Sequence, residues 1–242
     1  MIVFTDSNFY NYSIFPIGYT QTLAQAFACA QKDEQIQQKS CGHKKATTFL
    51  LYLTKSKIMS TKYKATTTED AYFVTITTVG WIDVFTRLNQ KESIIKALQF
   101  CQNNKGLEIY AYCIMTSHIH LLCKTINGFV MSDVMRDFKR FTSKKIIEII
   151  LDEPESRREW MLEYFRKACE HLKKEQQYKV WQNGYHAEHI YSNKFIRQKL
   201  DYIHNNPVKE KIVTLSEDYY FSSARNYASL DNELEVILLN LF

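Results

Sequence analysis

The chain has 242 residues, of which 45% are hydrophobic, and a formal net charge of +5. This length is enough for one sizeable domain and an appendage, and the small positive excess favours an anionic partner only slightly. The first basic residue is Lys32, so the charged region of a secretory signal is missing, and no apolar run approaches the roughly 20 residues that span a bilayer. We therefore expect a soluble, cytoplasmic protein with no membrane partner.

The cysteines support the same compartment. No two of them form a Cys-x-x-Cys pair, and several fall on apolar faces, which indicates buried free thiols in a reducing cytosol. They are Cys29, Cys41, Cys101, Cys113, Cys123 and Cys169.

The N-terminal segment differs from the rest of the chain. Residues 1–58 are rich in Gln, Ser, Thr, Tyr and Phe and show no sustained period, whereas a strand pattern follows Met59. We expect residues 59–242 to form the functional domain. Residues 1–58 are then a leader, either a poorly ordered appendage or a mis-assigned start, and a second domain is the alternative.

The first legible elements suggest a sheet with one helix between its strands. Residues 71–79 alternate as a strand, with Val74 and Ile76 set against the threonines between and after them. Residues 90–103 have helical spacing. Residues 107–115 alternate again, and after a break at Thr116-Ser117 the sequence HIHLLCK resumes, which predicts two antiparallel strands joined by a tight turn.

The second half of the domain has mainly helical spacing. Residues 131–150 carry an apolar stripe through Val134, Phe138 and Phe141, and residues 155–176 read as a charged helix that covers the domain. A further helix is predicted over 193–206, with Ser192 as its N-cap and Pro207 as its end. The buried stripe of this helix is formed by Ile196, Leu200 and Ile203. That of the charged helix is formed by Met161, Phe165, Cys169 and Leu172. This order predicts an α+β fold, an antiparallel sheet covered by helices.

Two histidines stand out on the second strand of the pair. Side chains at positions i and i+2 of a strand point to the same face, so His118 and His120 share one face while Ile119, Leu121 and Cys123 take the other. Two imidazoles on a rigid strand can chelate a divalent ion. The alternative is a pair of ordinary exposed or hydrogen-bonded histidines.

Tyr202 and Asn206 lie four residues apart on the last helix and therefore on one side of it. Tyr202 falls at the edge of the buried stripe, where a phenol could reach a phosphate. The Asn206 amide oxygen could complete a metal shell. Pro207 disfavours helical backbone at Asn206, so ideal spacing is not guaranteed. The alternative is that Tyr202 packs on the sheet and Asn206 caps the helix.

A basic stripe and a polar, aromatic segment are candidate DNA contacts. On the helix at 131–150, basic residues recur at helical spacing opposite the apolar stripe, as phosphate contacts require, although a solvated face has the same pattern. The segment WQNGYH at 181–186 could stack on or hydrogen-bond to unpaired bases, or could be a packed connection anchored by its tryptophan. The candidates are Arg136, Lys139, Arg140, Lys144, Trp181, Gln182, Tyr185 and His186.

Taken together, these motifs resemble the REP-associated tyrosine transposases, a branch of the single-tyrosine HUH transposases. The matching segments, within residues 65–230, are YCIMTSHIHLL (112–122), DFKRFTSKK (137–145), WQNGYH (181–186), DYIHNNPVK (201–209) and FSSARNY (221–227). The chain departs from the family at Thr116-Ser117, where the family has Pro-Asn or Pro-Ser, and in the long charged stretch at 151–176.

The resemblance implies a ferredoxin-like sheet of the HUH nuclease type and a transposase chemistry. His118 and His120 would bind a divalent metal, Mg²⁺ or Mn²⁺, Asn206 would take the place of a third polar ligand, and Tyr202 would be the nucleophile. The implied reaction cleaves and rejoins single-stranded DNA through a 5′-phosphotyrosine, and the implied partner is single-stranded DNA with a hairpin or palindromic repeat. A monomer or homodimer is expected.

Three other functions fit parts of this pattern. A catalytically silent protein of the same fold, domesticated for hairpin binding, would keep the basic helix and lose the catalytic set. A metal-dependent RNA-processing nuclease would use the histidines without Tyr202. Another HUH nuclease, a replication initiator or relaxase, would lack the tail motifs.

Overall fold

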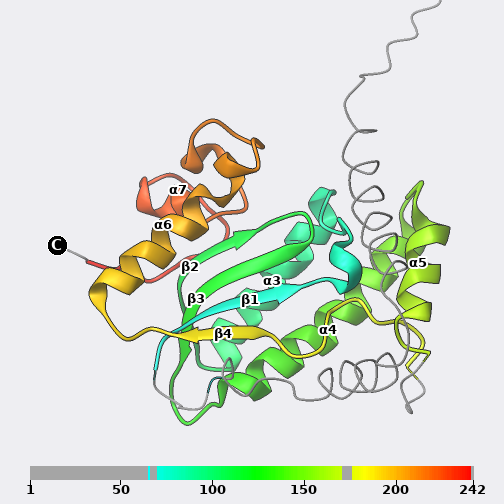
Figure 1. Cartoon of the computed structure of the whole chain (residues 1–242), viewed down its shortest axis with the longest axis horizontal. Coiled ribbons are helices and arrows are strands. Elements are labelled where there is room, and N and C mark those ends of the chain that lie inside the picture. Colours follow the sequence, from blue (N-terminus) through cyan, green and yellow to red (C-terminus); the bar gives the residue numbers. More distant parts are fainter. Residues whose placement is uncertain (1–64, 66–69, 171–175, 241–242) are drawn as a thin grey trace, which may run out of the picture. The chain divides into compact units, whose positions relative to one another are not determined.

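The computed structural model describes residues 65, 70–170 and 176–240. The predictions for residues 1–58, for the boundary at Met59 and for Leu172 lie outside this part of the chain. The described strands form one antiparallel sheet in the order β2-β3-β1-β4 (Figure 1). Its strands are β1 (Tyr72–Thr77), β2 (Leu107–Ile114), β3 (His118–Thr125) and β4 (His186–His189).

The predicted strands and their pairing are confirmed. β2 and β3 are antiparallel neighbours separated by the short break at residues 115–117, and β1 lies against the other edge of β3. Paired positions in an antiparallel sheet share a face. Thr75 opposite His120 and Thr77 opposite His118 therefore define one face. Val74 opposite Leu121 and Ile76 opposite Ile119 define the other, which is fully buried.

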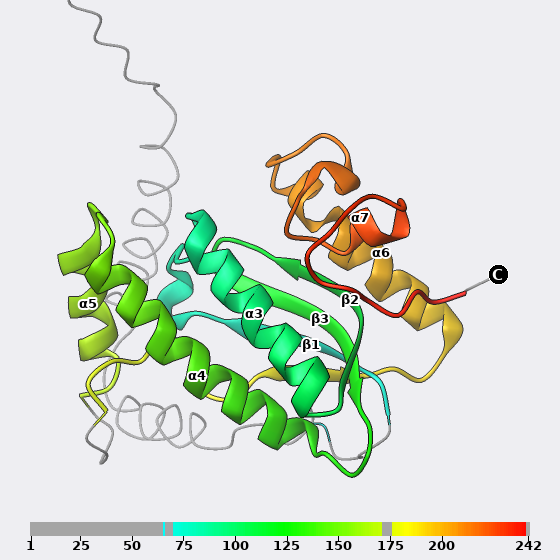
Figure 2. The ribbon, with the colours of Figure 1, turned by 180° about the vertical axis from the view of Figure 1, so that it is seen from behind.

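Two long helices cover the apolar face of the sheet (Figure 2). They are α3 (Leu88–Asn104) and α4 (Met131–Asp152), close to the predicted ranges. The prediction for Phe141 is wrong, because its ring is 58% exposed. The buried side of α4 passes through Phe138 and Thr142 instead. The cysteines in the described part of the chain, namely Cys101, Cys113, Cys123 and Cys169, are buried free thiols, as expected.

The charged helix is shorter than the sequence predicts. It forms α5 (Arg158–Lys167), not a helix over 155–176. Its end has a physical cause, because the backbone N–H of Lys179 donates to the Phe165 carbonyl, which would otherwise continue the helix, and Cys169 turns back to Arg166. Cys169 is nevertheless buried, as expected.

The last long helix, α6 (Asn193–Lys209), begins as predicted and ends later. Ser192 is its N-cap, since its hydroxyl accepts the N–H of Phe195 at 3.2 Å. Pro207 does not end the helix. Proline removes only its own N–H, and the final turn is closed by the N–H of Glu210 on the Asn206 carbonyl at 3.1 Å. Asn206 is therefore helical and buried.

The C-terminal segment fastens α6 to the sheet. Residues 221–223 run along β2, where Phe221 O accepts from Ile114 N and Ser223 N donates to Tyr112 O, so they cover that edge strand. The hydroxyl of Ser223 also lies 2.9 Å from His204 Nε2 on α6. The remaining short elements here are η3 (Ser216–Asp218) and α7 (Ala224–Tyr227), and η2 (Val79–Trp81) follows β1.

No helix within the described ranges has the length and apolar character needed to cross a membrane.

Candidate functional site

The two predicted histidines and the predicted tyrosine meet on the polar face of the sheet. The ring centres of His118 and His120 are 4.6 Å apart, and that of Tyr202 lies 5.2 Å from His120. Phe73 of β1 contacts both, stacked on His120 at 5.4 Å and edge-on to Tyr202 at 5.7 Å. Since α6 packs against β2 and β3, its outer edge carries the phenol to the histidines.

Each imidazole is oriented by a hydroxyl group. Thr75 Oγ1 lies 3.0 Å from His120 Nδ1, and Ser117 Oγ lies 3.2 Å from His118 Nδ1. If each hydroxyl oxygen accepts from an Nδ1–H, the Nε2 atoms carry the lone pairs, which is the tautomer a metal ligand needs. The altered turn at Thr116-Ser117 thus supplies a partner for the first histidine.

Both imidazoles are held neutral. Burial lowers the pKa of His120 to about 3, helped by the neighbouring His118 and by Lys199. Burial also lowers the pKa of His118, against an opposing effect of Asp83. Neutral imidazoles keep the lone pairs that bind a cation.

The donor set suits a divalent ion. His120 Nε2 is buried and has no hydrogen-bond partner, which is costly unless something binds there. His118 lies beside it and Asn206 is on the adjacent helix, and imidazole nitrogens with oxygen ligands suit first-row divalent ions. Among the described residues, no cluster of three or more His, Cys, Asp and Glu side chains is found.

Tyr202 stands at the open side of this cluster. Its side chain is 38% exposed, while Ile203 beside it is fully buried, as expected for the edge of the helical stripe. The ammonium groups of Lys199 and Lys209 lie 6.0 Å and 5.2 Å from its ring centre. Asn206 follows four residues later on the same continuous helix. The phenol is thus accessible and flanked by positive charge.

A series of polar and charged side chains from β4 and α6 borders the site. Glu188 accepts from Lys199 Nζ at 2.9 Å and lies 3.1 Å from His186 Nε2. His186 and His120 are both register partners of Thr75, on its two sides. His186 therefore belongs to the histidine face of the sheet rather than to the basic helix with which its motif was grouped.

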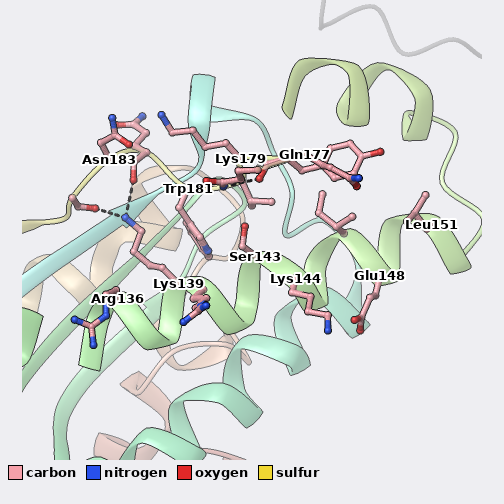
Figure 3. A pocket seen from close by; sticks show the side chains of 17 residues that line it. Arg136, Lys139, Ser143, Lys144, Glu148, Leu151, Gln177, Lys179, Trp181 and Asn183 are labelled. Carbon is pink, nitrogen blue, oxygen red and sulfur yellow. Dashed lines mark hydrogen bonds between the residues drawn. The ribbon is translucent and has the colours of Figure 1, made fainter. Parts of the chain in front are cut away.

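The basic stripe lies at a second place, an open pocket of about 960 Å³ between α4 and residues 176–184 (Figure 3). Arg140 and Lys144 line it and are exposed. Because α4 covers the apolar face of the sheet, this pocket and the histidine pair are on different faces. Residues 181–186 connect them, since they run from the pocket to β4.

Three candidate DNA contacts have structural roles in this pocket. Trp181 is only 4% exposed, and its indole N–H donates to Thr142 Oγ1 at 3.0 Å, so no ring face is free to stack on a base. Lys139 Nζ donates to the carbonyl oxygens of Gln182, at 2.7 Å, and of Gly184. The Gln182 amide donates to Thr78 O. Of the two readings of this segment from the sequence, Trp181 therefore fits the packed connection anchored by a tryptophan.

Two other candidates differ in accessibility. Arg136 is exposed but engaged by Asp133 and Asp137. The phenol of Tyr185 is half-buried, and burial raises its pKa to about 12. Among the basic candidates, this leaves Arg140 and Lys144 as the more accessible side chains.

Sequence reasoning missed several residues of the site. Thr75 was assigned to the polar face of its strand, but its pairing with His120 depends on strand register. Phe73 and Lys199 are joined to the site by a 4.3 Å contact between the Lys199 ammonium and the Phe73 ring, across β1 and α6. No local pattern signals such contacts between distant segments.

Comparison with known proteins gives a family and a fold. A family model described as "Transposase IS200 like" matches residues 71–176. The chain is also similar to a solved REP-associated tyrosine transposase bound to a REP hairpin. That likeness has 21% identity and a TM-score of 0.51, and it covers 76% of this chain and 96% of the other. None of the curated proteins compared with the chain matches it.

A second solved structure is reported as a candidate transposase of Deinococcus radiodurans R1. The match has 18% sequence identity and covers 60% of this chain and 97% of the other, but the TM-score of 0.36 is too low to show a shared fold. The family match and the shared sheet-and-helix fold confirm the resemblance that the motifs indicate. Over residues 71–176 the chain is therefore similar to the IS200-like transposases, and it shares its fold with the REP-associated tyrosine transposase.

Proposed function

We propose that this protein is a single-stranded DNA endonuclease and strand transferase that works through a covalent bond to Tyr202. The observation that carries the proposal is the contact between an accessible phenol and a buried histidine with an unpartnered nitrogen, 5.2 Å between ring centres. A nucleophile and a metal-binding group that meet at one point can act on the same phosphate.

The reaction follows from the groups present. Tyr202 Oη attacks phosphorus, the bond from phosphorus to the 3′ oxygen breaks, and a 5′-phosphotyrosine and a free 3′ hydroxyl result. The phenol gives its proton to solvent and the departing 3′ oxygen takes one up. Lys199 and Lys209 flank the ring and offset the negative charge of the phosphate and phenolate. Attack by another 3′ hydroxyl reverses these steps, so rejoining needs no ATP.

The metal expected here is Mg²⁺ or Mn²⁺, held by His118, His120 and Asn206. Such an ion polarises a phosphoryl oxygen and offsets its charge. Thr75 and Ser117 keep the two imidazoles in place, and Phe73 packs against His120 and keeps water from that side.

The substrate we propose is single-stranded DNA that carries a hairpin. This rests on the family and on the REP hairpin bound by the structurally similar transposase. The pocket between α4 and residues 176–184, with Arg140 and Lys144 exposed at it, suits the phosphates of a nucleic acid backbone. Residues 181–186, which join this pocket to the histidine face, give a path between the two.

The test is to incubate the full-length protein and Mn²⁺ with a panel of hairpin-tipped single strands. A denaturation-resistant protein–DNA adduct and a fragment with a free 3′ hydroxyl are expected, both abolished by EDTA. Fully duplex DNA of the same sequence is the control. Tight hairpin binding without cleavage would instead identify a silent hairpin-binding protein. Cleavage of RNA hairpins by the Tyr202→Phe variant would identify a nuclease that does not use the tyrosine.

A further inference from the structure

Trp81 is an exposed indole beside the candidate site. Its side chain is 59% exposed, the largest fraction among the three tryptophans of the chain. Its ring centre lies 5.4 Å from that of His118, edge-on. Its backbone has φ of +56°, a left-handed conformation that is rare and costly for a bulky side chain. The Trp81 ring is thus exposed to water, at a conformational cost, next to His118, a candidate metal ligand.

The turn that presents Trp81 is firmly anchored. The buried Thr78 hydroxyl contacts the carbonyl oxygens of Ile82 and Ser117, each at 2.9 Å, so the turn is tied to the residue before His118. Gly80 lies against α5, because a Cβ there would meet the end of the Tyr164 side chain. A rigid aromatic platform loses little conformational entropy on binding.

The four rings make a series of successive contacts. Trp81 contacts His118, His118 contacts His120, and His120 contacts Tyr202. Trp81 and Tyr202 are therefore on opposite sides of the histidine pair. A phosphate held at the pair has the nucleophile on one side and the indole on the other.

We propose that Trp81 is a stacking platform for one unpaired nucleobase, that of the nucleotide immediately 5′ of the scissile phosphate. This rests on the proposed function. In a displacement at phosphorus the attacking and leaving oxygens are roughly in line. The nucleotide that carries the leaving 3′ oxygen is therefore on the side away from Tyr202, where Trp81 stands. Stacking would hold that nucleotide, and its new 3′ hydroxyl, at the site after cleavage.

The experiment begins with a hairpin-tipped single strand whose cleaved bond has been mapped with the wild-type protein. Equilibrium binding is then measured by fluorescence anisotropy in the full-length Tyr202→Phe background, which removes cleavage. Three DNAs are compared: the intact strand, one abasic at the nucleotide 5′ of the scissile phosphate, and one abasic at the nucleotide 3′ of it. Trp81→Gly and Trp81→Asn both suit a positive φ, so they remove the ring without adding strain.

Loss of one base stack weakens binding by roughly 5- to 150-fold. We expect this loss for both variants with the intact strand and with the strand abasic on the 3′ side. With the strand abasic on the 5′ side, we expect no loss beyond about 2-fold, because the stacking partner is already gone. Trp81→Phe should retain most of the affinity. Phe100→Ala, which removes a similarly exposed ring from α3, should leave the affinity unchanged.

The proposal would be overturned if both Trp81 variants melt at the same temperature as the parent and bind the intact strand with unchanged affinity. An equal loss of affinity on all three DNAs would also overturn it. A loss that disappears only on the strand abasic on the 3′ side would contradict the assigned nucleotide. If the wild-type protein cleaves none of the DNAs, it is the proposed function that fails.

Discussion

If the two imidazoles bind a metal as proposed, the hydroxyl groups beside them should affect its affinity. Thr75 lies 3.0 Å from His120 Nδ1. Replacing it with Val keeps the strand and removes the hydroxyl, so Mn²⁺ affinity should fall by about 10- to 100-fold. Thr77→Val, on the same face of β1 but opposite His118, is the matched control and should bind Mn²⁺ like the wild type. Calorimetric titration measures both, and equal affinities would remove Thr75 from the site.

The histidines themselves should be needed for cleavage and not for hairpin binding. His118→Ala and His120→Ala each remove one of few protein ligands, so each should abolish Mn²⁺-stimulated cleavage. DNA affinity, measured by anisotropy without metal, should stay within a few-fold of wild type. Wild-type cleavage by either variant would exclude that residue as a ligand.

Residue-level prediction from the sequence reached as far as local periodicity allows. The shared face of His118 and His120 follows from the two-residue repeat of a strand, and the edge position of Tyr202 follows from helical spacing. Thr75, Lys199 and Trp81 join the site through strand register, a helix crossing and a positive-φ turn. These depend on tertiary contacts, which no local pattern contains.

At the scale of elements, the basic face of α4 should govern the salt dependence of DNA binding. Arg140 and Lys144 are the exposed cations at its pocket. Replacing both with Gln should lower the slope of log K against log salt by roughly 1.4 to 1.8, at about 0.7 to 0.9 per lost phosphate contact. Lys96→Gln, an exposed charge on α3, should leave the slope unchanged. An unaltered slope in the double variant would mean that α4 faces only water.

The helices also show where sequence prediction fails. The starts of α4 and α6 were found because spacing and the Ser192 cap are local signals. The ends of α5 and α6 were not predicted correctly. α5 stops because Lys179 takes the Phe165 carbonyl from a distant part of the chain, and α6 passes Pro207 because the last turn loses only one N–H there.

For the whole molecule, neutral histidines that are buried or partly buried should make stability fall in mild acid. Burial lowers the pKa of His204 to about 4 and that of His120 to about 3, both below the ordinary value of 6.5. The unfolded chain therefore binds protons first as the pH falls. The contribution of these histidines to the free energy of unfolding should be constant above about pH 7 and decrease by up to about 1.4 kcal/mol per pH unit per histidine between about pH 6 and 4.

Urea unfolding of the metal-free protein at pH 7.5 and pH 5 measures this decrease. His204→Asn should lessen it by one histidine's share, because its proton uptake is lost, while Ser223 keeps a polar partner. The protein is metal-free in this experiment, so the comparison does not depend on the ion. Parallel pH dependence in the variant and the wild type would show that the pKa of His204 is not lowered in the folded protein.

The proposed function depends on one covalent bond, between Tyr202 and the 5′ phosphate of the cleaved DNA. The protein has 16 tyrosines, and Tyr202 alone among them is joined to His120 by a ring contact within the described residues. The decisive measurement is peptide mapping, by mass spectrometry, of the adduct formed with hairpin-tipped single-stranded DNA and Mn²⁺. We predict a nucleotide linked to the peptide that contains Tyr202, and no adduct with Tyr202→Phe. A linkage at another tyrosine, or an adduct formed by the Phe variant, would contradict the account.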